Sequence, residues 1–325
     1  MYNDVIDPEI WLQHAWINRL QSLLLLAFMG GFLALVGWLL WGGIGVLMLL
    51  VLAMVLLLFN PTASPGLIMR LYGARPLAPT QAPDHYAVLR ELARRAGLAV
   101  VPTLYYVPSQ MVNAFTLGQK ERSVVAVTDG LMRALDMREQ IGVLAHEVSH
   151  IRSNDMWVLG LADMFSRLTS LLSLFGQLLL LINLPFLLLG EMTISWFAIL
   201  ILISAPSLSA LAQLGLSRTR EYDADLNAAR LSGDPEGLAL ALEKIERLQG
   251  GWLERLFLPG RRLPEPSLLR THPPTEQRVH RLMELKRPPA GSRLAFRADR
   301  LLPGAVLRGN GIQRAPRWHI TGLWH

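Results

Sequence analysis

Residues 144–150 read Leu144-Ala145-His146-Glu147-Val148-Ser149-His150, and the fold is expected to form around the helix that carries them. Asp136 can cap this helix, because Glu139 follows three residues later in the arrangement of a capping box. Apolar residues then recur on one helix face at Ile141, Leu144, Val148 and Ile151. Since an α-helix turns by about 100° per residue, His146 and His150 lie one above the other, roughly opposite that face. Two imidazoles can therefore reach one ion.

The spacing of these histidines suits zinc. Neutral imidazole nitrogens bind zinc at roughly 2.0 to 2.1 Å, and catalytic zinc sites take three protein ligands and leave the fourth position to water. Glu147 lies between the two histidines and is placed to accept a proton from that water as general base. A short H-E-x-x-H motif also arises by chance, and the alternative is a surface helix whose histidines are merely solvated.

A third ligand has to come from another part of the chain. The candidate is Glu221, in the stretch Ser217-Arg218-Thr219-Arg220-Glu221-Tyr222-Asp223-Ala224-Asp225. It completes a set of two histidines and one glutamate for one Zn²⁺ per chain. Asp225, one helical turn later, is predicted to accept a hydrogen bond from the far nitrogen of a ligand histidine, which fixes the orientation of the ring. The alternative for this pair of acids is a solvated helix face.

Long uncharged stretches predict a membrane-embedded part. The mean hydropathy of +0.33 is high for a soluble protein. Residues 20–69, 168–190 and 192–217 contain no Asp, Glu, Lys or Arg, and a Gly42-Gly43 break divides the first of them. Each side of that break is roughly 17 to 20 residues long, enough to span a bilayer. We therefore expect two transmembrane hairpins. The alternative for residues 168–215 is a hairpin that only dips into the bilayer.

Basic residues set the expected orientation of these spans. The loops around Gly42 and at 183–193 have neither Lys nor Arg. Seven arginines lie on the opposite side of the four-span arrangement: Arg19, Arg70, Arg75, Arg152, Arg167, Arg218 and Arg220. The positive-inside rule then places both termini and the catalytic site in the cytoplasm of a bacterial-type inner membrane. His150 and Glu221 are separated by two predicted crossings, so both fall on the same side. The acidic N-terminus and long apolar run favour a retained anchor over a cleaved signal peptide.

Charge and cysteine content exclude other classes of function. The net charge is +6, but residues 286–325 hold eight Lys or Arg against the single acid Asp299. A basic tail rich in Pro and Gly is typical of a solvated or lipid-facing appendage, so no nucleic-acid partner is expected. The chain has no cysteine, which excludes disulfides and thiolate metal ligands.

Between the predicted hairpins the sequence alternates helical and extended patterns. A helix is expected at Tyr86–Arg95, and three strand candidates, Thr103–Val107, Val112–Leu117 and Ser123–Thr128, predict a small antiparallel sheet. The expected fold is mainly α with this sheet (α+β), joined to two transmembrane hairpins. We divide the chain into an N-terminal transmembrane hairpin at 1–60, a first catalytic part at 61–167, a second hairpin at 168–215, a second catalytic part with the third ligand at 216–285 and a basic tail at 286–325.

Five blocks in order carry a family resemblance. They are Asn113-Ala114-Phe115, Thr128-Asp129-Gly130-Leu131, the 144–150 motif followed by Asn154-Asp155, the 217–225 stretch, and Thr271-His272-Pro273-Pro274 with Arg278. From about residue 60 to residue 285 the chain resembles the HtpX-like membrane metalloproteases of the M48 peptidase family, which also includes the CAAX prenyl proteases. The resemblance implies a gluzincin-type core with His146, His150 and Glu221 as ligands and Glu147 as base. It implies a zinc endopeptidase that degrades misfolded or damaged membrane proteins in quality control and stress response.

The resemblance suggests roles for other residues, each with an alternative. Asn113, Ala114 and Phe115 resemble the family's edge strand, which binds substrate backbone by β-augmentation, or form an ordinary amphipathic strand. His272 resembles a histidine that donates a hydrogen bond to the oxyanion, or is a loop residue that caps the next helix. Arginines 218, 220 and 278 either pair with Asp129, Asp155 or Asp225 to brace the site or hold the chain at the membrane surface.

Three competing functions remain. Intramembrane proteolysis is disfavoured because the charged residues around the motif, from Asp136 to Asp155, are costly at bilayer depth. CAAX-type processing of a prenylated protein would need a larger chamber with more spans than four. A non-catalytic membrane scaffold or chaperone stabilised by zinc is disfavoured because structural zinc sites are usually closed and rich in thiolates. Oligomeric state, substrate preference and the role of the tail stay open.

Overall fold

The computed structural model describes residues 6–58, 65–119, 121–189, 196–248 and 273–286, and in these ranges the chain is mostly helical. The elements in chain order are α1 (Pro8–Leu58), α2 (Pro65–Leu71), β1 (Arg75–Pro76), α3 (Pro83–Ala96), β2 (Thr103–Val107), β3 (Ala114–Leu117), β4 (Val124–Thr128), α4 (Asp129–Ala134), α5 (Met137–Ser153), α6 (Asp155–Leu188), α7 (Trp196–Ser232), α8 (Pro235–Leu248) and α10 (Thr275–Glu284). The tail at 287–325 and His272 lie outside the described residues.

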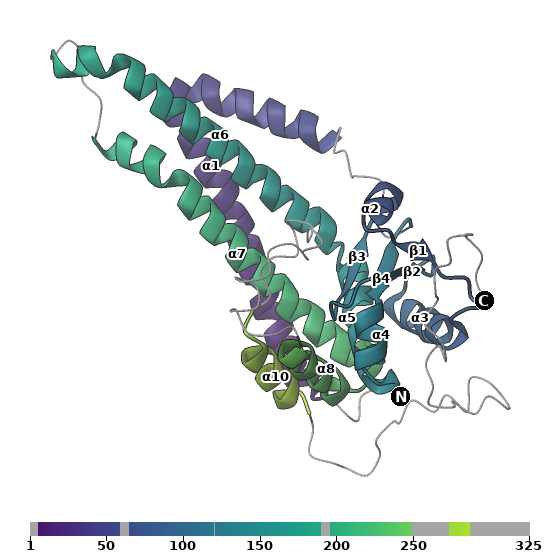
Figure 1. The fold of residues 1–325 in the computed structure, drawn as a ribbon. Helices are drawn as coiled ribbons and strands as arrows, with labels where there is room; N and C mark the ends of the chain where they lie inside the picture. Colours follow the sequence, from purple (N-terminus) through teal and green to yellow (C-terminus); the bar gives the residue numbers. More distant parts are fainter. Residues whose placement is uncertain (1–5, 59–64, 120, 190–195, 249–272, 287–325) are drawn as a thin grey trace.

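Three long helices, α1, α6 and α7, extend away from the part of the molecule that holds the sheet and the shorter helices (Figure 1). By length and composition each of them is apolar enough to cross a membrane, over Pro8–Ala53, Asp155–Phe186 and Trp196–Ser232. Their outer faces expose large apolar side chains, among them Leu23, Ile44, Leu171, Ile182, Phe197 and Leu200. An apolar surface of this kind is unfavourable in water and suits contact with lipid.

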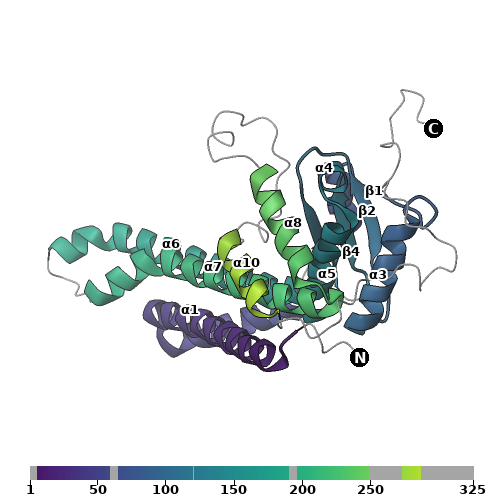
Figure 2. The same cartoon turned by 90° about the horizontal axis from the view of Figure 1, so that it is seen from below.

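Helix α1 changes direction sharply at the predicted glycine break, where Gly42 takes a φ of 63°. A glycine is needed there because side chains are strained in this left-handed region. The two arms approach closely, since a Cβ on Gly45 would lie 2.2 Å from the Gly37 carbonyl oxygen. Helices α6 and α7 lie side by side in Figures 1 and 2, and Ser173 donates a hydrogen bond to the Leu202 carbonyl. That these pieces cross a bilayer as two hairpins stays a prediction.

The sheet has the strand order β1-β2-β4-β3. The predicted strands are present, but the antiparallel sheet is corrected to a mixed one, because β2 and β4 pair in parallel while β1–β2 and β3–β4 pair antiparallel. The reason is burial. All five residues of β4 are buried, so β4 occupies a central position between β2 and β3, as a continuous apolar run does. Strand β3 is left at the edge.

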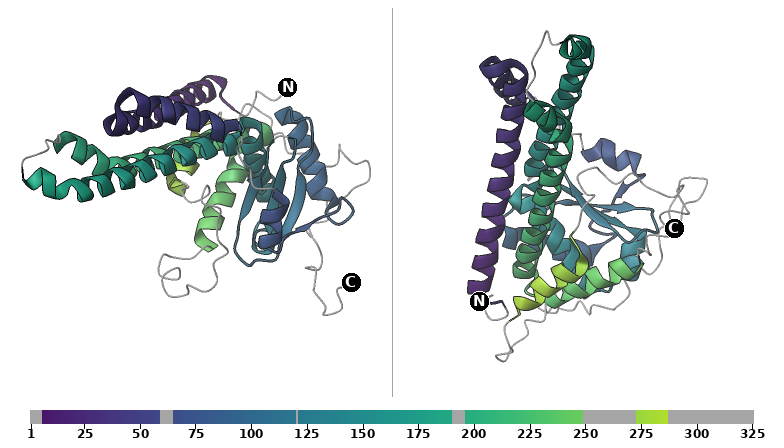
Figure 3. Two further views of the ribbon diagram at one scale, coloured as in Figure 1. Left: turned by 90° about the horizontal axis from the view of Figure 1, so that it is seen from above. Right: turned by 90° about the vertical axis from the view of Figure 1, so that its left-hand side faces the viewer.

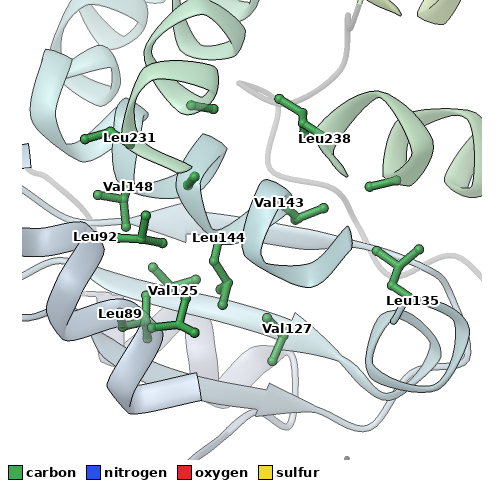
Figure 4. Close-up of a cluster of buried hydrophobic side chains, with 14 of the residues drawn as sticks. Leu89, Leu92, Val125, Val127, Leu135, Val143, Leu144, Val148, Leu231 and Leu238 are labelled. Carbon is green, nitrogen blue, oxygen red and sulfur yellow. The ribbon is translucent and has the colours of Figure 1, made fainter. Parts of the chain in front are cut away.

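Helix α5 packs on this sheet, and its apolar face contributes to the main apolar core (Figure 4). Val125 and Val127 of β4 meet Leu144 and Val148 of α5, and Leu89 and Leu92 of α3 close the cluster. Each fully buried aliphatic side chain contributes about 1.5–3 kcal/mol. Figure 3 shows α8 and α10 together, away from the sheet. Because α5 is fixed by this packing, the side chains on its other face have a defined direction.

The ends of α5 are set by local hydrogen bonds. The predicted capping box is present, since the Asp136 carboxylate accepts from the Glu139 N–H at 2.8 Å and the Glu139 carboxylate accepts from the Asp136 N–H at 2.8 Å. At the other end Asn154 takes a left-handed φ of 55°, a conformation that asparagine tolerates better than most residues. Asn154 is therefore the joint between the motif helix α5 and the long helix α6.

Candidate active site

Two helices bring the predicted ligands together. Helix α5 carries His146, Glu147 and His150, and α7 packs against α5 and carries Glu221. The four side chains are buried or nearly so, with Glu147 7% and Glu221 6% exposed. Of the residues that the structure describes, His146, His150 and Glu221 form a group that could hold a metal ion.

The distances between the candidate ligand atoms are compatible with tetrahedral coordination of one ion. The Nε2 atoms of His146 and His150 are 3.1 Å apart, and each lies 3.5 Å from an oxygen of Glu221. Two ligands at tetrahedral angles, each bonded at roughly 2.1 Å to one ion, are about 3.4 Å apart. Each Nε2 lies nearest a different oxygen of Glu221, and one ligand atom from each of the three residues lies within 4.8 Å of the others, a spacing compatible with one shared ion.

The hydrogen bonds of the two imidazoles also fit a cation. The Nδ1 atom of His146 lies 3.0 Å from Asp225 Oδ1, and that of His150 lies 2.7 Å from Asp155 Oδ2. Each Nδ1 therefore donates to its carboxylate, and whenever the two rings are neutral each Nε2 carries a lone pair. Two lone pairs facing each other at 3.1 Å repel unless a cation lies between them. The donor set therefore fits a metal.

Each of these carboxylates is in turn held by an arginine. Arg278 of α10 donates to both oxygens of Asp225, at 2.6 and 2.7 Å, in a bidentate pair. Arg220 of α7 donates from Nε to Asp155 Oδ1 at 2.6 Å. Both arginines are buried, and these are two of the pairings left open by the sequence. The third, at Asp129, is made instead by Arg133 at 2.8 Å.

Asp155 as the partner of His150 is a contact that sequence reasoning missed. It is the first residue of α6, and the left-handed turn at Asn154 carries its carboxylate back toward α5. A signal exists in the sequence, because Asp155 follows His150 by five residues across a predicted helix end. Only the turn geometry shows that the two meet.

The surroundings favour positive charge at this place. Burial alone lowers the pKa of His146, but hydrogen bonds to Asp225 and Glu221 outweigh it and raise the pKa to about 10. The pKa of His150 is likewise lowered by burial and raised overall by its hydrogen bond to Asp155. A pocket whose carboxylates stabilise an imidazolium also stabilises a metal cation.

The strand beside the site is β3, at the edge of the sheet. Asn113 precedes β3 and is hydrogen-bonded to Thr128, the last residue of β4. The Asn113 N–H donates to the Thr128 hydroxyl, and the Asn113 carbonyl accepts from the Thr128 N–H and hydroxyl, at distances of 2.8 to 3.0 Å. Phe115 is buried in a second apolar cluster with Met69. Ala114 is half-buried on the opposite face. The main chain of β3 pairs with β4 on one side, which leaves its other edge as the candidate surface for a peptide.

Comparison with known proteins was made at three levels. The model of peptidase family M48 matches residues 79–286. A protease HtpX homolog of Paraburkholderia phytofirmans is 32% identical over 286 residues, covering 83% of this chain and 98% of the relative. One from Pyrococcus furiosus is 34% identical over 287 residues, covering 81% and 94%. Among solved structures, the crystal structure of S. mikatae Ste24p aligns with a TM-score of 0.46 and 22% identity, over 82% of this chain and 66% of that one.

Proposed function

We propose, since the chain belongs to peptidase family M48, that it is a membrane-anchored zinc metalloendopeptidase with its active site on the cytoplasmic side. Family membership confirms the resemblance drawn from the sequence and supports a membrane metalloprotease that acts on polypeptides. The finer proposal concerns the metal, the side of the membrane and the substrates, which we take to be misfolded or damaged membrane proteins.

The observation that carries the proposal is the cluster of His146, His150 and Glu221, in which the two Nε2 atoms are 3.1 Å apart and each lies 3.5 Å from one of the two Glu221 oxygens. Zinc, when held by His146, His150 and Glu221, would polarise a peptide carbonyl and make a water molecule more acidic. Glu147 would take the proton of the attacking water and later deliver it to the leaving amine. Asp225 and Asp155 keep both imidazoles in the tautomer that leaves Nε2 free.

Two further parts of the site belong to the proposal. An extended peptide would pair with the free edge of β3 at Asn113, Ala114 and Phe115 by main-chain hydrogen bonds, which explains action on many sequences. His272, which lies outside the described residues, would donate a hydrogen bond to the oxyanion of the tetrahedral intermediate. It is joined through Pro273 and Pro274 to α10, whose Arg278 reaches the site.

The organisation of the chain follows from the same proposal. Segments 1–60 and 168–215 would be the membrane hairpins, and segments 61–167 and 216–285 would form one catalytic unit on the cytoplasmic surface. Two observations support this arrangement. Helix α5 packs against the C-terminal part of α7, where Glu221 lies, and the opposite end of α7 and the C-terminal end of α6 are apolar and exposed. The catalytic unit would then bind damaged membrane proteins at the point where their polar segments leave the bilayer.

Replacement of Glu147 by Gln tests the proposal. The full-length protein in detergent should keep one zinc per chain and lose roughly 10²- to 10⁴-fold in casein cleavage, because the amide cannot accept the proton. Zinc content by elemental analysis and cleavage of labelled casein are measured side by side for both proteins. Equal cleavage by the two would contradict the role of Glu147, and retained zinc without cleavage in the wild type would favour a zinc-stabilised scaffold.

A further inference from the structure

Thr116 is a polar residue of the edge strand β3, and none of the sequence motifs includes it. Successive side chains of a strand point to opposite faces. Phe115 and Leu117 of β3 enter the apolar cluster around Met69, so Thr116 points to the other face, toward α5. Its side chain is 3% exposed, although threonine is usually a surface residue.

The buried hydroxyl of Thr116 meets the carboxylate of Glu147. Thr116 Oγ1 donates to Glu147 Oε2 at 2.8 Å, and it lies 3.4 Å from the backbone oxygen of the same residue. A hydroxyl has one proton, and the shorter contact to a charged acceptor is the stronger hydrogen bond. The proton therefore goes to the carboxylate, and the partners come from segments 31 residues apart in the chain.

This hydrogen bond restricts the carboxylate in a useful way. A glutamate side chain has three rotatable bonds, whereas threonine is stiff at its single χ1 and stands on a strand fixed by β4. A carboxylate has several acceptor positions, so a bond at Oε2 leaves Oε1 free to receive a proton. A general base is effective only when it is held close to the required position.

We propose that Thr116 is a positioning residue for the general base, an inference that rests on the proposed function of Glu147. Its hydroxyl holds Oε2 so that Oε1 faces the attacking water. Because Thr116 stands in β3, it also fixes the base relative to the strand edge against which a substrate would pair. Thr116 itself exchanges no proton with the substrate.

The test compares two changes at Thr116 with a matched change elsewhere. Thr116→Val removes the hydroxyl at nearly constant shape, and Thr116→Ser keeps it. Thr169→Val is the control, since Thr169 on α6 is also buried but its hydroxyl has no hydrogen-bond partner among the described residues. Steady-state cleavage of labelled casein is measured with zinc-loaded, full-length protein in detergent. Should Thr116→Val not fold, Thr116→Ala takes its place.

The expected result is a loss in kcat on the order of tenfold for Thr116→Val with KM unchanged, a part of the roughly 10²- to 10⁴-fold that a general base supplies. Thr116→Ser should keep most of kcat, and Thr169→Val all of it. A Thr116→Val protein with wild-type kcat would overturn the inference. So would a Thr116→Ser protein that loses as much as Thr116→Val, because the hydroxyl would then not be what matters.

A second readout needs neither metal nor activity. Thermal unfolding of the metal-free protein is followed for Thr116→Val, Glu147→Ala and the double variant. Thr116→Val should lower Tm by roughly 2–4 °C in the wild type and much less when Glu147 is absent, because the two side chains are in contact. If the Tm decrease of the double variant equals the sum of the decreases of Thr116→Val and Glu147→Ala, the inference is overturned.

The outcomes also separate this inference from the proposed function. Cleavage unchanged in Glu147→Gln would refute the general base and with it both proposals. Cleavage lost in Glu147→Gln but unchanged in Thr116→Val would refute only the role of Thr116.

Discussion

Each of the two candidate ligand histidines is hydrogen-bonded to a carboxylate, and each carboxylate to a buried arginine. His146 is held by Asp225 and Arg278, and His150 by Asp155 and Arg220. The chain of contacts fixes the ring orientation and compensates the charge of the buried acids. Removal of one carboxylate therefore releases an imidazole and takes from an arginine its shortest ion pair.

We expect Asp155→Asn to weaken metal binding by about 10- to 100-fold, because the amide no longer favours the Nδ1–H tautomer of His150. Competition with a zinc chelator measures the change in affinity. Asp163→Asn is the control, since Asp163 lies on the same helix and pairs with Arg167 at 2.7 Å, away from the ligands. Equal affinities for Asp155→Asn and the wild type would show that the contact does not tune the metal site.

At the scale of elements, the position of α5 depends on a close approach to α8. A Cβ added at Gly142 would lie 2.8 Å from both the Cα and the N of Leu238, which are backbone atoms that cannot turn aside. Only glycine lets the two helices come this near. The contact sets how far α5, and with it both ligand histidines, stands from α8.

Gly142→Ala is accordingly expected to destabilise the fold by about 1–3 kcal/mol, since a methyl group must be forced between packed backbones. Gly160→Ala in α6 is the matched control, because no heavy atom lies within 4 Å of its added Cβ. Thermal unfolding in detergent reports both. A Gly142→Ala protein as stable as the Gly160→Ala protein would mean that α8 can move away at little cost.

At the scale of the whole molecule, the proposed topology makes a prediction about sides of the membrane. The natural chain has no cysteine, so single cysteines report position without background. Arg90→Cys, at an exposed position of α3, should react with an impermeant maleimide only in inverted vesicles. Gly43→Cys, at the bend of α1 where an added side chain meets nothing within 4 Å, should react only from the outer side.

Labelling of both positions from one side would contradict the first transmembrane hairpin. Labelling with the sides exchanged would keep the hairpin and contradict a cytoplasmic site. Either result would leave the geometry of the metal site untouched, because that geometry involves only the contacts between α5, α6, α7 and α10.

Local pattern in the sequence determined a large part of this protein. The helix that carries His146 and His150, its capping box and the bend at Gly42 follow from short-range rules, since each depends on residues within one or two turns. Long apolar runs likewise determined the three helices that are long enough to span a membrane. The set of two histidines and one glutamate was also predictable from chemistry and order along the chain.

Tertiary structure decided what joins distant segments. Strand candidates do not encode their partners or directions, so the parallel pairing of β2 with β4 is seen only in the folded sheet. The bond between Thr116 and Glu147 spans 31 residues, and that between Arg220 and Asp155 spans 65. A hydrogen bond requires placement within a few tenths of an ångström. Packing of the core sets that placement, and the sequence pattern alone does not.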